Sequence, residues 1–176
     1  MDTRPTADRL RETLFNVLTQ GAVDRVDGAR VLDLYAGSGA VGIEALSRGA
    51  AGAVFVEQGA RALEVLQKNL GALGIREGVS VVKRGVGRYL RDSAQRASDS
   101  GLRFWVIFLD PPYDVAAEYE ATLGFLGEPG CGLLEDGGLV VAEHRRKQPL
   151  AEQYGVLGRV RVIEQGDAAL SFYARS

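Results

Sequence analysis

The stretch Leu32-Asp33-Leu34-Tyr35-Ala36-Gly37-Ser38-Gly39-Ala40-Val41-Gly42 decides the fold, because it joins an apolar run to a glycine turn and then to a helical pattern. The apolar run at 31–34 predicts a buried strand, and helical spacing resumes through Ile43 and Leu46 and stops at Gly49. A strand that enters a helix through such a turn lets backbone N–H groups approach a ligand at the carboxyl edge of a sheet. We therefore expect a ligand-binding loop at this stretch.

Outward from this loop, apolar runs alternate with helical patterns along the chain. Strands are predicted at 53–56, 79–82, 105–109 and 138–143, and helices at 6–19, 59–73, 86–97 and 115–127. The tail alternates over 156–163 and 169–173 around Gly166-Asp167, which predicts an antiparallel hairpin. The pattern predicts one α/β domain over residues 1–176, with a doubly wound, mostly parallel seven-stranded sheet and an antiparallel C-terminal hairpin.

The composition excludes several classes of protein. The chain has 176 residues, of which 46% are hydrophobic and 25% charged, as in an ordinary globular domain. A single cysteine and a single histidine exclude a Cys-rich zinc site and a His-clustered metal site, so we expect no metal. No apolar run approaches the ~18 residues of a membrane span, and the opening residues are too polar for a signal peptide. We expect a soluble cytoplasmic protein with no membrane partner. The net charge of −2 does not by itself indicate a nucleic-acid-binding protein.

Two cofactors are compatible with the glycine turn. Gly37, Gly39 and Gly42 match the dinucleotide pattern G-x-G-x-x-G, and Glu57 follows at the spacing of a ribose-binding carboxylate. Asp33 favours the other cofactor, because a carboxylate that faces the pocket would repel a pyrophosphate and would suit the ammonium and sulfonium of S-adenosylmethionine. Glu57 suits ribose hydroxyls in either case. The structural alternative is that Asp33 caps the loop and the glycines only make a tight turn.

The second chemical motif is Asp110-Pro111-Pro112-Tyr113, which follows the buried run at 105–109. Two prolines stiffen the loop and remove two N–H donors, so that it presents carbonyl acceptors. With the Asp110 carboxylate these acceptors could hold an exocyclic amine, and Tyr113 offers a flat face on which a base can stack. The alternative is an ordinary turn at a strand end.

The glycine loop combined with the DPPY motif resembles the class I S-adenosylmethionine-dependent amino methyltransferases. The opening residues Arg4-Pro5-Thr6-Ala7-Asp8-Arg9-Leu10-Arg11-Glu12-Thr13-Leu14-Phe15-Asn16, with Asp33–Gly39 and Glu44-Ala45-Leu46-Ser47-Arg48-Gly49, narrow the resemblance to RsmD-type guanine-N2 methyltransferases. This resemblance implies methyl transfer from S-adenosylmethionine, with S-adenosylhomocysteine as product, to the N2 of a guanine in 16S ribosomal RNA. The partner would be the small ribosomal subunit or its assembly intermediate, and the enzyme a monomer without a metal.

The resemblance also assigns roles to residues of this chain. The catalytic residues would be Asp110, Pro111, Pro112 and Tyr113. The cofactor would be held by Asp33, Tyr35, Ala36, Gly37, Ser38, Gly39, Glu57, Gln58, Gly85, Val86 and Asp110. The chain departs from the family at Gly85, where Asp or Asn usually holds the adenine amine, so backbone groups at Gly85 and Val86 would replace that side chain. It also begins almost at the RPT motif, and we expect the family's basic N-terminal hairpin to be absent.

Three other functions remain open at this stage. A DNA adenine-N6 methyltransferase shares the DPPY motif, but 176 residues leave no room for an extra target-recognition domain. A nicotinamide-dependent oxidoreductase would use the glycine pattern, and a non-catalytic RNA-binding module would need no chemistry. The basic residues within 83–103, with a net charge of +4, and Arg145-Arg146-Lys147 could contact RNA phosphates or form a solvated surface.

Overall fold

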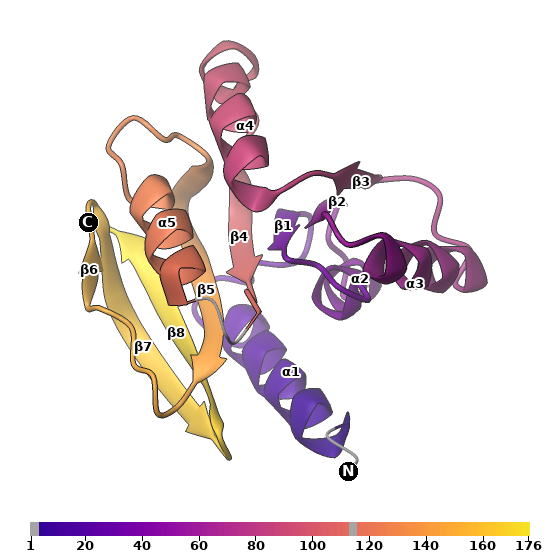
Figure 1. Cartoon of the computed structure of the whole chain (residues 1–176), viewed down its shortest axis with the longest axis horizontal. Helices are drawn as coiled ribbons and strands as arrows, with labels where there is room; N and C mark the ends of the chain where they lie inside the picture. Colours follow the sequence, from indigo (N-terminus) through magenta and orange to yellow (C-terminus); the bar gives the residue numbers. More distant parts are fainter. Residues whose placement is uncertain (1–3, 113–115) are drawn as a thin grey trace.

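The structure, a computed structural model, describes residues 4–112 and 116–176 (Figure 1). Eight strands form one sheet in the order β3-β2-β1-β4-β5-β8-β7-β6. The strands are β1 Arg30–Leu34, β2 Gly52–Glu57, β3 Val79–Lys83, β4 Phe104–Leu109, β5 Leu134–Arg145, β6 Gln153–Tyr154, β7 Leu157–Gln165 and β8 Ala168–Arg175. The first five pair in parallel, whereas β8, β7 and β6 add to β5 in antiparallel fashion.

Helices cover both faces of the sheet. They are α1 Arg4–Thr19, α2 Ala40–Ser47, α3 Ala60–Ala72, α4 Val86–Ser100 and α5 Ala116–Leu126. One core cluster joins Leu32 and Leu34 of β1 to residues of α4 and α5. On the other face, Val31 packs with residues of α1, and Phe55 of β2 packs with residues of α3. The predicted doubly wound α/β fold with an antiparallel C-terminal addition is confirmed.

The structure differs from the prediction mainly at element ends. The sheet has eight strands where seven were predicted, because the two-residue β6 is too short to leave a periodic pattern in the sequence. Strand β5 begins at Leu134 rather than at residue 138, since its pairing with β4 continues past an irregularity between Phe104 and Val106. The hairpin of β7 and β8 turns at Gly166-Asp167, as predicted.

Two glycines of the loop are required by close packing. Gly39 has φ +81°, and a β-carbon there would lie 2.2 Å from Leu66 Cδ1 of α3. A β-carbon on Gly42 would lie 2.4 Å from the ring of Phe55. Helix α2 can therefore lie close against β2 and α3 only because these positions have no side chain.

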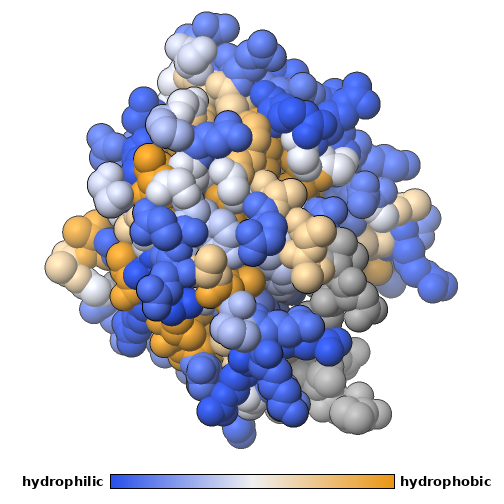
Figure 2. Space-filling model, turned by 60° about the vertical axis from the view of Figure 1, so that its left-hand side comes forward, coloured by the Kyte–Doolittle hydropathy of each residue, from blue (hydrophilic) through white to orange (hydrophobic). Residues whose placement is uncertain are grey.

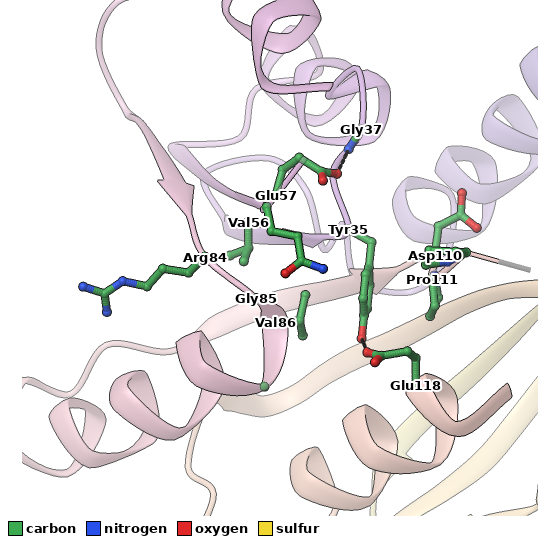
Figure 3. Close-up of a pocket in the computed structure, with 13 residues that line it drawn as sticks. Tyr35, Gly37, Val56, Glu57, Arg84, Gly85, Val86, Asp110, Pro111 and Glu118 are labelled. Atoms are coloured by element: carbon green, nitrogen blue, oxygen red, sulfur yellow. Dashed lines mark hydrogen bonds between the residues drawn. The ribbon is translucent and has the colours of Figure 1, made fainter. Parts of the chain in front are cut away.

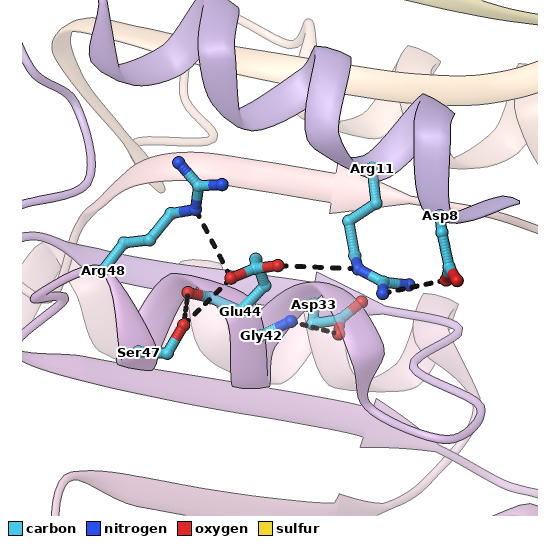
Figure 4. A network of polar contacts seen from close by, with 7 residues as sticks. All are labelled: Asp8, Arg11, Asp33, Gly42, Glu44, Ser47 and Arg48. Atoms are coloured by element: carbon cyan, nitrogen blue, oxygen red, sulfur yellow. Dashed lines mark hydrogen bonds and ion pairs between the residues drawn. The ribbon is translucent and has the colours of Figure 1, made fainter. Parts of the chain in front are cut away.

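Polar contacts join α1 to α2 (Figure 4). The Arg11 guanidinium of α1 lies 3.0 Å from the Asp8 carboxylate and 3.8 Å from the Glu44 carboxylate of α2. Glu44 also forms an ion pair with Arg48, with an N–O distance of 3.4 Å. The Arg48 guanidinium lies over the Phe15 ring, 5.2 Å from its centre. Two of the stretches that carry the family resemblance, 4–16 and 44–49, are thus in contact with each other.

No helix in the described part of the chain is long and apolar enough to span a bilayer. The face that carries the C-terminal strands shows hydrophobic areas separated by hydrophilic ones (Figure 2). The exposed hydrophobic side chains on β7 are Val160, which is 62% exposed, and Val162, which is 39% exposed.

We expect Gly42→Ala to destabilise the protein, because its methyl group would overlap the buried Phe55 ring. Overpacking of this kind costs ~1–3 kcal/mol of unfolding free energy. Gly71→Ala is the matched control: it also lies in a helix, but nothing lies within 4 Å of its added carbon. That control should be neutral or stabilise by up to ~1 kcal/mol. Urea denaturation measures both, and equal stabilities of the two variants would contradict the proposed packing constraint.

Candidate functional site

A cavity of about 520 Å³ lies at the carboxyl ends of β1, β2, β3 and β4 (Figure 3). Its size is that of a site for a cofactor or a drug-sized ligand. It also lies where the strand order reverses between β1 and β4, the usual ligand position in an open parallel sheet. The lining residues are Tyr35, Gly37, Val56, Glu57, Gln58, Arg84, Gly85, Val86, Gly87, Asp110, Pro111, Pro112 and Glu118.

The backbone N–H groups of the glycine loop are bonded to carboxylates. The Gly37 N–H donates to Glu57 Oε1 at 2.8 Å, and the Gly42 N–H donates to Asp33 Oδ2 at 3.0 Å. The second oxygen of Glu57 accepts the Gly59 N–H at 2.9 Å. The Gly39 N–H donates to the carbonyl of Ala36 at 2.8 Å. The loop is therefore held by acceptors that the protein itself supplies.

The structure corrects the predicted position of Asp33. Its side chain is only 2% exposed and does not line the cavity. It lies on the same face of β1 as Val31, directed toward α2, where it accepts the Gly42 N–H (Figure 4). Burial raises the pKa of Asp33 to about 8, against the lowering effect of the Gly42 hydrogen bond. The capping role that was the structural alternative describes its contacts better than direct contact with a ligand.

Tyr35 holds an unusual backbone conformation at the end of β1. Its φ is +57°, the one positive value among the non-glycine residues that the structure describes. Its hydroxyl donates to Glu118 Oε2 at 2.6 Å and lies 2.8 Å from Thr122 Oγ1 of α5. Burial, with the bond to Glu118, raises the Tyr35 pKa, so the phenol stays neutral. Strained backbone held by such contacts is common at functional sites.

The DPPY motif reaches the cavity from β4. Asp110, Pro111 and Pro112 line it, whereas Tyr113 lies outside the residues that the structure describes. Burial, together with the nearby carboxyl groups of Glu143 and Asp33, raises the pKa of Asp110 to about 8. In Figure 3 the Asp110 carboxyl group points away from Glu118. Asp110 and Glu118 thus lie on the β4 and α5 sides of the cavity, with their carboxyl groups apart.

Most of the predicted cofactor residues lie in the cavity wall. Those that line it are Tyr35, Gly37, Glu57, Gln58, Gly85, Val86 and Asp110. Ala36, Ser38 and Gly39 do not: the Ala36 N–H donates to the Val56 carbonyl at 3.0 Å, and the Ser38 carbonyl accepts from Asn69 Nδ2 at 3.0 Å. These residues shape the loop rather than the surface of the cavity.

Four lining residues were not predicted, namely Val56, Arg84, Gly87 and Glu118. Val56 and Arg84 are chain neighbours of predicted residues. No sequence pattern pointed to Glu118, because α5 lies beside Tyr35 only in the folded chain. The Arg84 side chain points away from the cavity (Figure 3) and bonds Asp92 at 2.8 Å. Within residues 4–112 and 116–176 no group of three His, Cys, Asp or Glu side chains could hold a metal ion.

Residues 1–174 match the family model described as "Conserved hypothetical protein 95". The chain belongs to this family. It is 37% identical over 173 residues to the "Putative rRNA methyltransferase YlbH" of Bacillus subtilis, covering 98% of this chain and 88% of that protein. It is 40% identical over 141 residues to the "Ribosomal RNA small subunit methyltransferase D" of Escherichia coli, which covers 80% of this chain and 60% of the relative. The predicted membership in the RsmD-type methyltransferases is confirmed.

The fold of a solved relative agrees with this assignment. The structure titled "Putative methyltransferase yhhF" from Escherichia coli superposes with a TM-score of 0.78 at 32% identity, covering 96% of this chain and 86% of that one. The predicted class I methyltransferase fold is thereby confirmed.

We expect Asp33→Asn to flatten the pH dependence of stability. A carboxyl group whose pKa is raised on folding stabilises the protein below its unfolded pKa of ~4 and loses that contribution as pH rises through the folded value. For Asp33 that window is from about 4 to about 8. The urea midpoint of the wild-type protein should therefore decrease as the pH rises from 5 to 8. The decrease should be smaller in Asp33→Asn.

Asp24→Asn is the control for this measurement. Hydrogen bonds from the Asp27 and Val26 N–H groups lower the Asp24 pKa, so its contribution is lost as pH falls rather than as pH rises. It should leave the decline between pH 5 and pH 8 unchanged. A decline of equal size in wild type and Asp33→Asn would show that Asp33 is not protonated in the folded state.

Proposed function

We propose that this protein transfers a methyl group from S-adenosylmethionine to the exocyclic N2 of a guanine in small-subunit ribosomal RNA, within an assembled or assembling subunit. The observation that carries the choice of cofactor is the bonding of the glycine loop. Its N–H groups at Gly37 and Gly42 already donate to carboxyl groups of the protein.

This bonding disfavours a dinucleotide. A nicotinamide cofactor would bring a pyrophosphate to free N–H groups at the start of α2. Here the Gly37 N–H of this loop donates to Glu57, so a phosphate at the loop would meet the carboxylate of Glu57. The described lining contains the carboxyl groups of Glu57, Asp110 and Glu118, and its one cationic residue, Arg84, bonds to Asp92. An acceptor-rich cavity suits a ligand that carries an ammonium and a sulfonium.

The residues present fit S-adenosylmethionine, which when bound supplies an electrophilic methyl group on its sulfonium. Glu57, at the end of β2, would accept hydrogen bonds from the ribose hydroxyls, with its carboxylate fixed by the Gly37 and Gly59 N–H groups. Gly85 and Val86, at the start of α4, would contact the adenine through backbone groups. Each contact comes from the carboxyl end of a different strand or the turn that follows it.

The substrate side of the cavity is formed by the loop after β4. A guanine amine is a poor nucleophile, since its lone pair is delocalised into the ring. Acceptors at Asp110 and at the Pro111 carbonyl would hold the two amine hydrogens, favour a pyramidal nitrogen and stabilise its developing positive charge. The base must be splayed out of a folded RNA to reach this loop, where it would stack on Tyr113.

The names of the relatives support the RNA substrate. Both curated relatives described above are named rRNA methyltransferases, and one is named for the small subunit. The chain spans 60% of the length of that relative.

Labelled methyl transfer tests the function directly. The protein should transfer methyl groups from S-adenosylmethionine to small subunits, or their precursors, from a strain that lacks the corresponding methylase. Nucleotide mapping should then find one N2-methylguanine. In a thermal-shift comparison S-adenosylmethionine should stabilise the protein and NAD should not. Stabilisation by NAD alone would reject the proposed cofactor.

Glu57→Ala should weaken S-adenosylmethionine binding without unfolding the domain. Loss of hydrogen bonds to a charged group, worth ~1.5–3 kcal/mol, corresponds to roughly 10- to 150-fold in affinity. Calorimetry measures the affinity, and Glu64→Ala on the exposed face of α3 is the matched control. Equal affinities of the two variants would remove Glu57 from the cofactor site.

Gly85→Asn should strengthen cofactor binding. The position has an ordinary φ of −66°, and an added carbon would meet only the end of the Gln58 side chain, at 3.3 Å. A new neutral hydrogen bond to the adenine amine, worth ~0.5–1.5 kcal/mol, would raise affinity by about 2- to 12-fold. Gly85→Ala adds the carbon without the amide and should show no gain by calorimetry. A gain of equal size in both variants would exclude the amide as its cause.

Asp110→Ala should lower the methylation rate by about 10²–10³-fold, the usual effect of removing one preorganised group at a reaction centre. The affinity for S-adenosylmethionine should stay within a few-fold of wild type, because Asp110 is assigned to the substrate amine. Single-turnover methylation and calorimetry together separate the two effects. Parallel loss of binding and rate would instead make Asp110 a cofactor or structural residue.

A further inference from the structure

Three carboxyl groups stand in a row at the edge of the sheet where the cavity lies. They belong to Asp33 of β1, Asp110 at the end of β4, and Glu143 of β5. Leu109 pairs with Ala142, so Asp110 and Glu143 follow in register on neighbouring strands. Strand alternation directs all three to the face of Val31, Phe108 and Val141, which packs against α1.

The register sets the Asp110 and Glu143 side chains next to each other, on the same face of the sheet at the ends of neighbouring strands. Two neighbouring carboxyl groups can hydrogen-bond to each other only when one of them carries a proton. Both are largely buried, and burial raises the pKa of each. None of the ion pairs within residues 7–112 and 116–176 includes Asp33, Asp110 or Glu143.

The charged groups around Asp110 and Glu143 do not favour the ionisation of both carboxyl groups. From β1, the Asp33 carboxyl group acts on Asp110 in the same direction as Glu143 does. From α1, Arg11 is engaged with Asp8 and Glu44 (Figure 4). His144 follows Glu143 but is directed to the opposite face, where its Nε2 lies 2.8 Å from Ser171 Oγ.

We propose that Glu143 is a positioning residue for Asp110: the two groups share one proton, which orients Asp110 toward the substrate amine and gives the departing amine proton a final acceptor. The inference rests on the proposed methylation of an exocyclic amine. Nothing in the DPPY motif itself points to Glu143, which lies 33 positions further along the chain.

The shared proton determines which oxygen of Asp110 donates a hydrogen bond and which oxygen accepts one from the substrate. Its protonated oxygen donates to Glu143, and the other oxygen is left as an acceptor for the amine hydrogen. This arrangement has the same donor and acceptor groups as an asparagine amide. Asp110 is thereby fixed by a bond on one side and acts on the substrate from the other.

The same pair can remove the proton that methylation leaves in excess. One N–H bond of the methylated nitrogen breaks, the electron pair stays on nitrogen, and the proton goes to the acceptor oxygen of Asp110. The O–H proton of Asp110 passes at the same time to Glu143. Asp110 ends as a neutral acid with its proton on the other oxygen, and Glu143 returns to a carboxylate by losing its proton to water.

Infrared spectroscopy of the protein without cofactor or RNA tests the shared proton. Asp33 also has a raised pKa, so the measurement uses Asp33→Asn as its background. In that background a protonated-carboxyl band should persist at pH 7, and adding Asp110→Asn should abolish it. Adding Glu143→Gln should shift its titration to lower pH. A band that is absent, or that Glu143→Gln does not move, would overturn the inference.

Steady-state methylation against pH tests the positioning role. Wild-type kcat should fall above about pH 8, where the pair loses its proton, and Asp110→Asn should lack this decline because an amide does not titrate. Glu143→Gln should lower kcat by about 10²-fold, the lower range of proton-transfer effects, with the affinity for S-adenosylmethionine unchanged.

Glu135→Gln, near the other end of β5, is the control and should keep both kcat and its pH profile. A Glu143→Gln protein with the wild-type rate and profile would reject the positioning role. If the wild-type protein methylated no ribosomal RNA, the proposed function would fail, while the infrared result would still decide whether the proton is shared.

Discussion

The carboxyl edge of the sheet depends on the hydrogen bonds between the glycine-loop N–H groups and the carboxyl groups of neighbouring strands. Asp33 of β1 holds the Gly42 N–H, and Glu57 of β2 holds those of Gly37 and Gly59. These bonds start α2 close against β2, where only glycine fits beside Phe55. They also place the Glu57 carboxyl group against the Gly37 N–H, where it would repel a phosphate at the loop.

This arrangement concentrates carboxyl groups where little water reaches them. Burial raises the pKa of Asp33 and of Asp110, so part of the charge is neutralised by bound protons rather than by arginine or lysine. Such groups lower the stability of the folded chain at neutral pH, and their clustering is typical of a functional site rather than of a structural core. A cationic ligand would interact favourably with the charge that remains.

The sequence predicts those parts of the site that depend on local order along the chain. The glycine loop, Glu57 and the Asp-Pro-Pro turn each follow a strand, and parallel strands bring their carboxyl ends together. The partner of Asp33 was harder to predict from the sequence. Strand alternation places Asp33 on the same face as Val31, but only the position of α2 in the folded chain shows that the Gly42 N–H is its partner. Its side chain lies outside the cavity lining, and its predicted contact with the ligand stays a prediction.

Contacts between distant segments could not be predicted from local patterns. The positive φ of Tyr35 is stabilised by Glu118, which lies 83 positions away on α5. Glu143 reaches Asp110 only because β5 pairs with β4, and its run of apolar neighbours indicates no more than a buried strand. The contacts of the N-terminal motif also join distant segments. Its residues Arg11 and Phe15 contact Glu44 and Arg48 of the segment after the glycine loop, so the motif supports the loop without lining the cavity.

The strand order joins the cofactor and substrate sides of the site. From β2 through β1 and β4 to β5, each neighbouring strand contributes one carboxyl group at its end: Glu57, Asp33, Asp110 and Glu143. The reversal of strand order between β1 and β4 divides this row. On one side lies the loop assigned to the cofactor, and on the other the turn assigned to the amine. In the proposed function the sulfonium methyl and the amine would meet at this boundary, where Asp33 acts electrostatically on Asp110 while it holds the start of α2. A change in the loop bonds on one side would therefore alter the proton affinity of Asp110, the group proposed to bind the substrate on the other.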